Sequence, residues 1–212
     1  MTKLEMDYNQ ELARKLIHLS SLWIPCLYAL VSKGVMSGTM LLATLAVIAF
    51  DIIRHIDPKV AAIVNPIFGS IMRSHERKPI GIYNGFLAGF SGATCLMLGS
   101  FVTILLFPKL IAITAIAILI VSDAAAAIVG RRFGKRYIGG KTLEGSIAFF
   151  ITGYIVVIII GIMAKQHFVF YFGCLPALIF TTFVELLAKN FKIDDNIAIP
   201  LTFSFVMFLL NA

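Results

Sequence analysis

The sequence predicts an all-α protein, a polytopic transmembrane helical bundle of about seven transmembrane helices with its N-terminus on the cytoplasmic side. Composition is the first reason, because 59% of the 212 residues are hydrophobic and only 14% are charged, against about 25% charged in a soluble domain. The second reason is that the apolar residues form stretches close to the roughly 20 residues that cross a bilayer. Lys and Arg also gather in alternate connecting segments, as in multi-pass proteins. Residues 1–212 are therefore interpreted as one integral-membrane domain.

The apolar spans follow one another along the chain with short polar segments between them. Glycines interrupt the third span, and glycine is tolerated where membrane helices pack closely. The stretch 54–80 contains Pro58 and Pro66 and is interpreted as a loop with one interfacial amphipathic helix. The predicted spans are 16–32, 35–53, 82–107, 108–129, 143–164, 169–188 and 196–211.

The distribution of basic residues predicts the orientation of these spans. With seven spans, fifteen of the 18 Lys and Arg residues fall on the side of the N-terminus, and only Lys33, Lys109 and Lys165 fall on the other. Cytoplasmic loops carry the excess of Lys and Arg. We therefore expect a cytoplasmic N-terminus and an external C-terminus.

Several sequence signatures are not expected to contribute. The first fifteen residues are polar, and no cleavable signal is recognised. Cys26, Cys95 and Cys174 all fall inside apolar spans without the spacing of a zinc site or a disulfide framework. We interpret the three cysteines as packing residues.

Acidic residues lie on the same side as the basic ones, and this is the main indication of a ligand. Anionic lipid headgroups attract Lys and Arg by about 1 kcal/mol each, which accounts for part of the basic charge. Acids gain nothing from that attraction. An anionic, phosphorylated ligand with a metal ion would explain both signs of charge. The acids on this side are Glu76, Asp123, Glu144, Glu185, Asp194 and Asp195.

Asp123 is the sharpest single signal. It follows the apolar run LIAITAIAILIVS and precedes AAAAIVG, so it lies inside the fourth span. A charge at the centre of a membrane helix costs about 2.5–3.5 kcal/mol on insertion scales, and such acids usually face a cavity and a partner. Ala126, Ala127 and Gly130 share its helical face and leave room for a ligand or a close helix.

The segment 130–146, GRRFGKRYIGGKTLEGS, places glycines and basic residues around Thr142 and Glu144. Such a segment can direct backbone N–H groups and cations toward phosphate oxygens. It is not a Walker A loop, because the glycine spacing differs and it leaves a membrane helix rather than a strand. Thr142 could instead cap the fifth span, with Gly145 serving helix packing. Mg²⁺ needs one or two carboxylates besides phosphate oxygens, so Asp123 with a second acid would suffice, and Lys141 would neutralise the transferring group.

Three weaker clusters complete the polar side. His18 could be an interfacial packing residue, and Arg73 with Glu76 could be a surface pair. The clusters are Arg14, Lys15 and His18; Arg73 and Glu76; and Glu185, Lys189, Asp195 and Asn196.

Taken together, these clusters resemble the CTP-dependent lipid-alcohol kinases, the family of dolichol kinase, phytol kinase and CTP-dependent diacylglycerol kinase. The resemblance covers most of the chain. Phosphatidate cytidylyltransferases share its central motif, but they carry a longer Lys-Asp and His-Gly-Gly-containing ending that is absent here. The motifs are Arg14-Lys15-x-x-His18, Arg73-x-x-Glu76, Asp123-x-x-Ala126-x-x-x-Gly130-x-x-x-Gly134, Gly140-Lys141-Thr142-x-Glu144-Gly145-Ser146, Glu185, and Asp195-Asn196-x-x-Ile199-Pro200.

The resemblance implies a membrane kinase that moves the γ-phosphoryl of CTP, with Mg²⁺, to the hydroxyl of a lipid alcohol at the cytoplasmic face. It implies metal ligands Asp123 and Asp195. Glu144 would support the metal or Lys141, and Glu185 would orient Lys189 or act as a base. It implies lipid-side residues Arg14, Lys15, His18, Arg73 and Glu76. The implied nucleotide-binding residues are Arg131, Gly139, Gly140, Lys141, Thr142, Lys189 and Asn196.

Two other functions remain open. A phosphatidate cytidylyltransferase would use the same triphosphate site and release pyrophosphate with a CDP-lipid. A transporter coupled through Asp123 would need polar residues on the outer side, where these spans have few. We expect a membrane lipid as substrate and no nucleic-acid partner, and the chain could form a homodimer.

Overall fold

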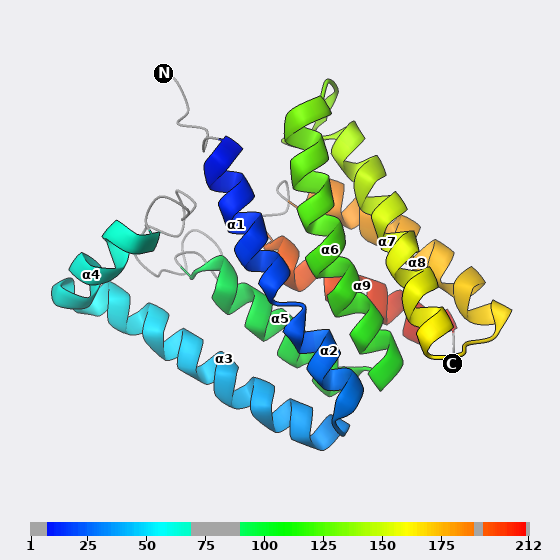
Figure 1. Cartoon of the computed structure of the whole chain (residues 1–212), viewed down its shortest axis with the longest axis horizontal. Coiled ribbons are helices and arrows are strands. Elements are labelled where there is room, and N and C mark those ends of the chain that lie inside the picture. Colours follow the sequence, from blue (N-terminus) through cyan, green and yellow to red (C-terminus); the bar gives the residue numbers. More distant parts are fainter. Residues whose placement is uncertain (1–7, 69–89, 189–192, 211–212) are drawn as a thin grey trace.

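The computed structural model describes residues 8–68, 90–188 and 193–210, and within them the protein is a bundle of helices (Figure 1). One two-stranded antiparallel hairpin, β1 (Tyr137–Ile138) and β2 (Lys141–Thr142), interrupts the helices. The helices are α1 (Tyr8–Ser20), α2 (Trp23–Leu30), α3 (Lys33–Ile56), α4 (Pro58–Phe68), α5 (Gly92–Leu106), α6 (Lys109–Phe133), α7 (Leu143–Met163), α8 (Phe168–Leu187) and α9 (Asp195–Leu210).

Four of the described helices, α3, α6, α7 and α8, are long and apolar enough to cross a membrane. Two more, α5 and α9, are apolar but shorter. The all-α class of the prediction is confirmed, whereas the count of seven spans and the orientation stay predictions. The part of the third predicted span that precedes residue 90 lies outside the described residues.

The first predicted span, 16–32, is not one helix. It is divided between α1 and α2, with a turn at Ser21 and Leu22. Pro25 supplies the physical reason, because a proline has no N–H for the carbonyl four residues earlier and its ring collides with that carbonyl. That carbonyl belongs to Ser21, and it accepts instead from the N–H of Ile24. The break separates a polar amphipathic helix from a short apolar one.

Helix α6 is the centre of the bundle. It contacts α1, α2, α5, α7 and α9, and Figure 1 shows it between α1 on one side and α7 on the other. Its middle turns carry small and β-branched residues such as Ala115, Ile116 and Ile118, all fully buried. The middle of α6 is therefore surrounded by protein, and Asp123, 7% exposed, lies in this part of the helix.

The two ends of the bundle differ in chemistry. The end with the β1–β2 hairpin, here called the hairpin end, also holds the last turns of α6 and the first turn of α7 (Figure 1). At the opposite end, two lysine side chains form hydrogen bonds between the α2–α3 connection and the α5–α6 connection. Lys33 Nζ donates to the carbonyl of Phe107 at 3.0 Å, and Lys109 Nζ donates to those of Ala29 and Val31 at 3.1 and 2.8 Å.

Candidate functional site

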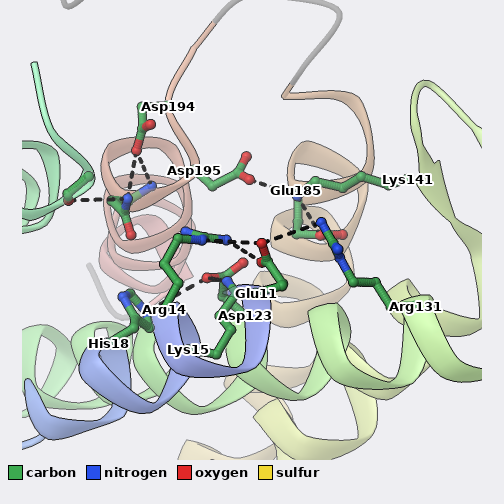
Figure 2. Close-up of polar contacts among 12 residues, drawn as sticks. Glu11, Arg14, Lys15, His18, Asp123, Arg131, Lys141, Glu185, Asp194 and Asp195 are labelled. Atoms are coloured by element: carbon green, nitrogen blue, oxygen red, sulfur yellow. Dashed lines mark hydrogen bonds and ion pairs between the residues drawn. The ribbon is translucent and has the colours of Figure 1, made fainter. Parts of the chain in front are cut away.

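Lys141 joins three elements at the hairpin end. From β2, its Nζ donates to Glu185 Oε1 on α8 at 2.5 Å and to Asp195 Oδ2 on α9 at 2.8 Å (Figure 2). Ser146, in the first turn of α7, donates its hydroxyl to the other Glu185 oxygen at 3.0 Å. The structure thus brings together four polar residues that are up to 54 positions apart in sequence.

The surroundings of Lys141 favour its charged ammonium form. Burial disfavours the charged ammonium, but the carboxylates of Asp195 and Glu185 outweigh burial and raise the pKa of Lys141 above its ordinary value. Asp123 contributes to the same shift. Lys141 is therefore a fixed cation in a cluster of acids. Glu185 was predicted to orient Lys189 or to act as a base; Lys189 lies outside the described residues, and both Glu185 oxygens already accept hydrogen bonds.

A second ion pair lies beside the first and connects α1 to α6. Lys15 Nζ donates to Asp123 Oδ2, and both residues are buried, 2% and 7% exposed. His18 Nε2 lies 3.7 Å from the same Asp123 oxygen. Among the described residues, that imidazole nitrogen is buried without a hydrogen-bond partner. Two members of the predicted cluster, Lys15 and His18, therefore lie close to Asp123 in space, whereas Arg14 pairs with Glu11.

Glu11 extends this group and was not among the predicted site residues. Its carboxylate accepts from Arg14 Nε at 3.3 Å and from Arg131 Nη2 at 3.4 Å. Burial opposes ionisation, but Arg14, Lys15 and Arg131 hold the pKa of Glu11 below its ordinary value. The spacing Glu11-x-x-Arg14 could have revealed the local pair, whereas the contact with α6 depends on tertiary packing.

The hairpin that carries Lys141 is built from its glycines. Gly139 and Gly140 have φ of 58° and 82°, so they form the two-residue turn with positive φ that favours glycine between antiparallel strands. Glu144 Oε2 accepts from the backbone N–H of Lys135 and Arg136 at 3.1 and 3.3 Å. In this structure Glu144 holds the hairpin backbone, a role that sequence reasoning did not assign.

Thr142 fixes the start of α7. Its hydroxyl accepts from the N–H of Gly145 at 3.2 Å, which confirms the capping alternative for this residue. Gly130 and Gly145 flank it, and a Cβ on Gly130 would lie 2.5 Å from Thr142 Oγ1. Small residues therefore let α6 and α7 approach closely, and the cap holds Lys141 at the edge of both helices.

Asn196 lies where α9 meets α5. Its Nδ2 donates to Asp194 Oδ1 at 2.8 Å and to the carbonyl of Gly92 at 3.4 Å. Asp194 Oδ1 also accepts from the Asn196 backbone N–H at 2.9 Å. Asp194 thus caps α9 and presents Asp195 toward Lys141.

One further buried acid, Asp51 on α3, was not predicted. Asp51 is 2% exposed, and its Oδ1 lies 3.2 Å from Arg54 Nη2. Its Oδ2 accepts from Ser91 N–H and Thr94 Oγ1 at the start of α5, at 2.8 and 2.6 Å. The signal that identified Asp123, an acid within an apolar run, could have found it.

The donor set is compatible with a metal ion but does not by itself form a metal site. Across the described ranges, no three His, Cys, Asp or Glu side chains gather as metal ligands would. Asp195 Oδ1, however, is buried and has no hydrogen-bond partner in the described part of the chain. Mg²⁺ needs only one or two protein carboxylates when phosphates supply the rest, so Asp195 with Asp123 fits that chemistry. The predicted residues Arg73, Glu76 and Lys189 lie outside the described residues.

Two of the known proteins that are similar to this chain are lipid kinases. The chain is 32% identical over 200 residues to an uncharacterized protein of Rickettsia prowazekii, which covers 93% of each chain. It is 24% identical over 172 residues to CTP-dependent diacylglycerol kinase 1 of Schizosaccharomyces pombe, 76% of this chain and 74% of that one. It is 35% identical over 82 residues to dolichol kinase of Saccharomyces cerevisiae, 38% of this chain and 16% of the kinase. No known family profile and no solved structure matches.

Proposed function

The chain belongs to one family with the Rickettsia prowazekii protein and has two lipid kinases as distant homologues, and on that premise we propose that it is a membrane kinase for a lipid alcohol. The donor would be CTP with Mg²⁺, and the acceptor hydroxyl would belong to a polyprenol or dolichol, phytol or diacylglycerol. The reaction would take place at the cytoplasmic face, which we identify with the hairpin end.

The observation that carries the proposal is the pairing of Lys141 with Glu185 and Asp195 beside the pair of Lys15 and Asp123. Four acids and four basic residues meet there, and the additional His18 lies beside them. A cluster with this balance can take up a polyanion and a divalent cation together without leaving a buried charge unpaired, which is otherwise costly. The acids and bases are Glu11, Asp123, Glu185 and Asp195, and Arg14, Lys15, Arg131 and Lys141.

Each residue then has a definite task. Asp123 and Asp195 would hold Mg²⁺, which when bound neutralises charge on the phosphates. Lys15 and Lys141 can each exchange a carboxylate oxygen for a phosphate oxygen, because an ammonium is a compact charge with three donors. Arg131, 35% exposed at its side chain, can reach an outer phosphate. Glu185 and Ser146 keep Lys141 in position during that exchange.

The transfer itself needs little covalent chemistry from the protein. A bond forms between the acceptor oxygen and the γ-phosphorus, the bond from that phosphorus to the β-bridging oxygen breaks, and the hydroxyl proton is released to water. Because the transition state is loose, positioning and charge neutralisation provide most of the catalysis. Fixed cations such as Lys141 suit this requirement.

An apolar pocket of about 210 Å³ between α8 and α9 supports a lipid acceptor. Its lining residues Val184 and Ile193 are close in sequence to the site residues Glu185 and Asp195, although none of those site residues lines the pocket. Two of its α8 lining residues, Phe180 and Phe183, are exposed, as expected of a face toward lipid. We assign the pocket to the hydrocarbon part of the acceptor.

The test is direct phosphoryl transfer by the purified full-length chain in lipid nanodiscs. CTP or ATP labelled at the γ-phosphate would be supplied with Mg²⁺ and one of diacylglycerol, phytol or polyprenol. The proposal predicts label in the lipid, CDP as the second product and no transfer by Lys141→Met. Formation of a CDP-lipid with pyrophosphate, or no transfer to any acceptor, would contradict it.

A further inference from the structure

The buried acid Asp51 lies outside the proposed site, yet it fixes the helix that the site rests on. Its Oδ2 accepts two hydrogen bonds at the start of α5, from Ser91 N–H and Thr94 Oγ1. Ser91 Oγ in turn accepts from the N–H of Thr94 at 3.3 Å and caps α5. Asp51 on α3 therefore sets the position of the first turn of α5.

That first turn is in contact with the start of α9. The carbonyl of Gly92 accepts from Asn196 Nδ2 at 3.4 Å. Further along α5, Gly99 packs against the carbonyl of Asn196 so closely that a Cβ would overlap with it. Any shift of α5 must therefore move Asn196, and with it the adjacent Asp195.

We infer that Asp51 is a positioning residue, which holds Asp195 against Lys141 through α5 and Asn196. The role in catalysis rests on the proposed function. A carboxylate suits the task because a single oxygen accepts from both a backbone amide and a hydroxyl while the other meets Arg54. An asparagine has only one acceptor oxygen and lacks the charge that Asp51 presents to Arg54.

If the contact of Asp51 with α5 served only stability, its loss would affect only the start of α5. If Asp51 is a positioning residue, its loss must also change the start of α9. Thr94→Val removes the hydroxyl that Asp51 accepts and keeps the side-chain shape, and Thr94→Ser restores the hydroxyl. Thr103→Val is the matched control, because Thr103 is also buried on α5 but donates only to the carbonyl of Gly99 within its own helix. Asp51→Asn tests the acid itself.

Two measurements on the full chain in nanodiscs separate this inference from the proposed function. The first is hydrogen exchange at the amides of Ile197 and Ala198, which bond to the carbonyl of Asp194. We expect faster exchange there in Thr94→Val and Asp51→Asn, wild-type exchange in Thr94→Ser, and no change in Thr103→Val. This readout needs no activity.

The second measurement is turnover with CTP and lipid. Because a misplacement of about 1 Å can cost about 100-fold in rate, we expect kcat to fall about tenfold or more in Thr94→Val. KM for CTP should change little, and Thr94→Ser should recover kcat. Unchanged exchange at Ile197 and Ala198, equal effects of Thr94→Val and Thr103→Val, or unchanged kcat would each overturn the inference. A wild-type chain that transfers no phosphoryl group would refute the proposed function, while the exchange comparison would still decide the coupling.

Discussion

Lys15 and Asp123 form a buried ion pair that connects the amphipathic first helix to the centre of the bundle, although 108 positions separate them in sequence. Both side chains are almost fully enclosed, at 2% and 10% exposure. The pair is therefore both part of the proposed site and the main polar link between α1 and α6. Its two roles can be separated by mutation.

Lys15→Met should destabilise the protein strongly, because it leaves the carboxylate of Asp123 buried without its cation. Breaking a buried pair in this way costs about 3–5 kcal/mol. The double variant Lys15→Met with Asp123→Asn should recover much of that loss, since no charge remains unpaired. Thermal unfolding in nanodiscs measures the cycle, and additive losses would show that the two residues do not depend on each other.

Asp123→Asn alone should still insert but be less stable than the wild type, because Lys15 is then buried without its carboxylate. It should lose Mg²⁺-dependent turnover, because the amide keeps the shape of the side chain without its charge. The comparison with the double variant distinguishes stability from chemistry: the double variant should be stable and inactive. An active Asp123→Asn protein would reduce this residue to a structural role.

Lys141→Met should lose nearly all turnover, and Lys141→Arg should recover only part of it, because the planar guanidinium cannot occupy the position of an ammonium between two carboxylates. Lys135→Met is the matched control, since Lys135 lies in the same connection with an exposed side chain. Initial rates with labelled CTP give the comparison. Equal losses in the two Met variants would mean that the connection contributes only general positive charge.

Ala198→Phe should fill the apolar pocket between α8 and α9. If the hydrocarbon part of the acceptor occupies that pocket, KM for the lipid should rise about tenfold, the loss expected for about 1.4 kcal/mol of binding. KM for CTP should stay near the wild-type value. A change in the nucleotide KM of similar size would instead indicate a general distortion of α9.

The orientation prediction can be checked without any enzymatic assay. Reporter fusions after Ala212 should be active only outside the cytoplasm, and fusions in the connection that contains Lys135 only inside it. A C-terminal reporter that is active in the cytoplasm would contradict the seven-span topology. The fold itself would not be affected by that result.

Sequence reasoning identified many members of the candidate site but not how they pair. Asp123 was conspicuous because a charge inside an apolar run needs a partner, yet nothing in the sequence selects Lys15 over the other bases. Pairing depends on how α1 packs on α6, a contact between distant segments. The contact of Glu11 with Arg131 was not predicted for the same reason, since the two residues approach each other only in the folded bundle.

Local structure was predicted unevenly. The start of α7 followed from Thr142, because capping is a property of four consecutive residues. The division of the first span was missed, although Pro25 signals it, because apolar composition continues across the break. The two-residue strands of the hairpin are too short for any hydrophobic period to register. Arg73, Glu76 and Lys189 stay predictions.

The lysine contacts between the Ala29–Lys33 and Phe107–Lys109 connections help to explain the distribution of Lys and Arg that predicts the orientation in the membrane. Lys33 and Lys109 are two of the three positive charges that oppose the predicted orientation, and both donate to backbone carbonyls that end neighbouring helices. Those carbonyls have no partner within their helices, so the two cations satisfy helix ends of the fold. Only Lys165, with a φ of 51° in the turn after α7, remains outside this arrangement. Apart from Lys165, the only Lys and Arg residues that oppose the predicted orientation are therefore two that hydrogen-bond helix ends.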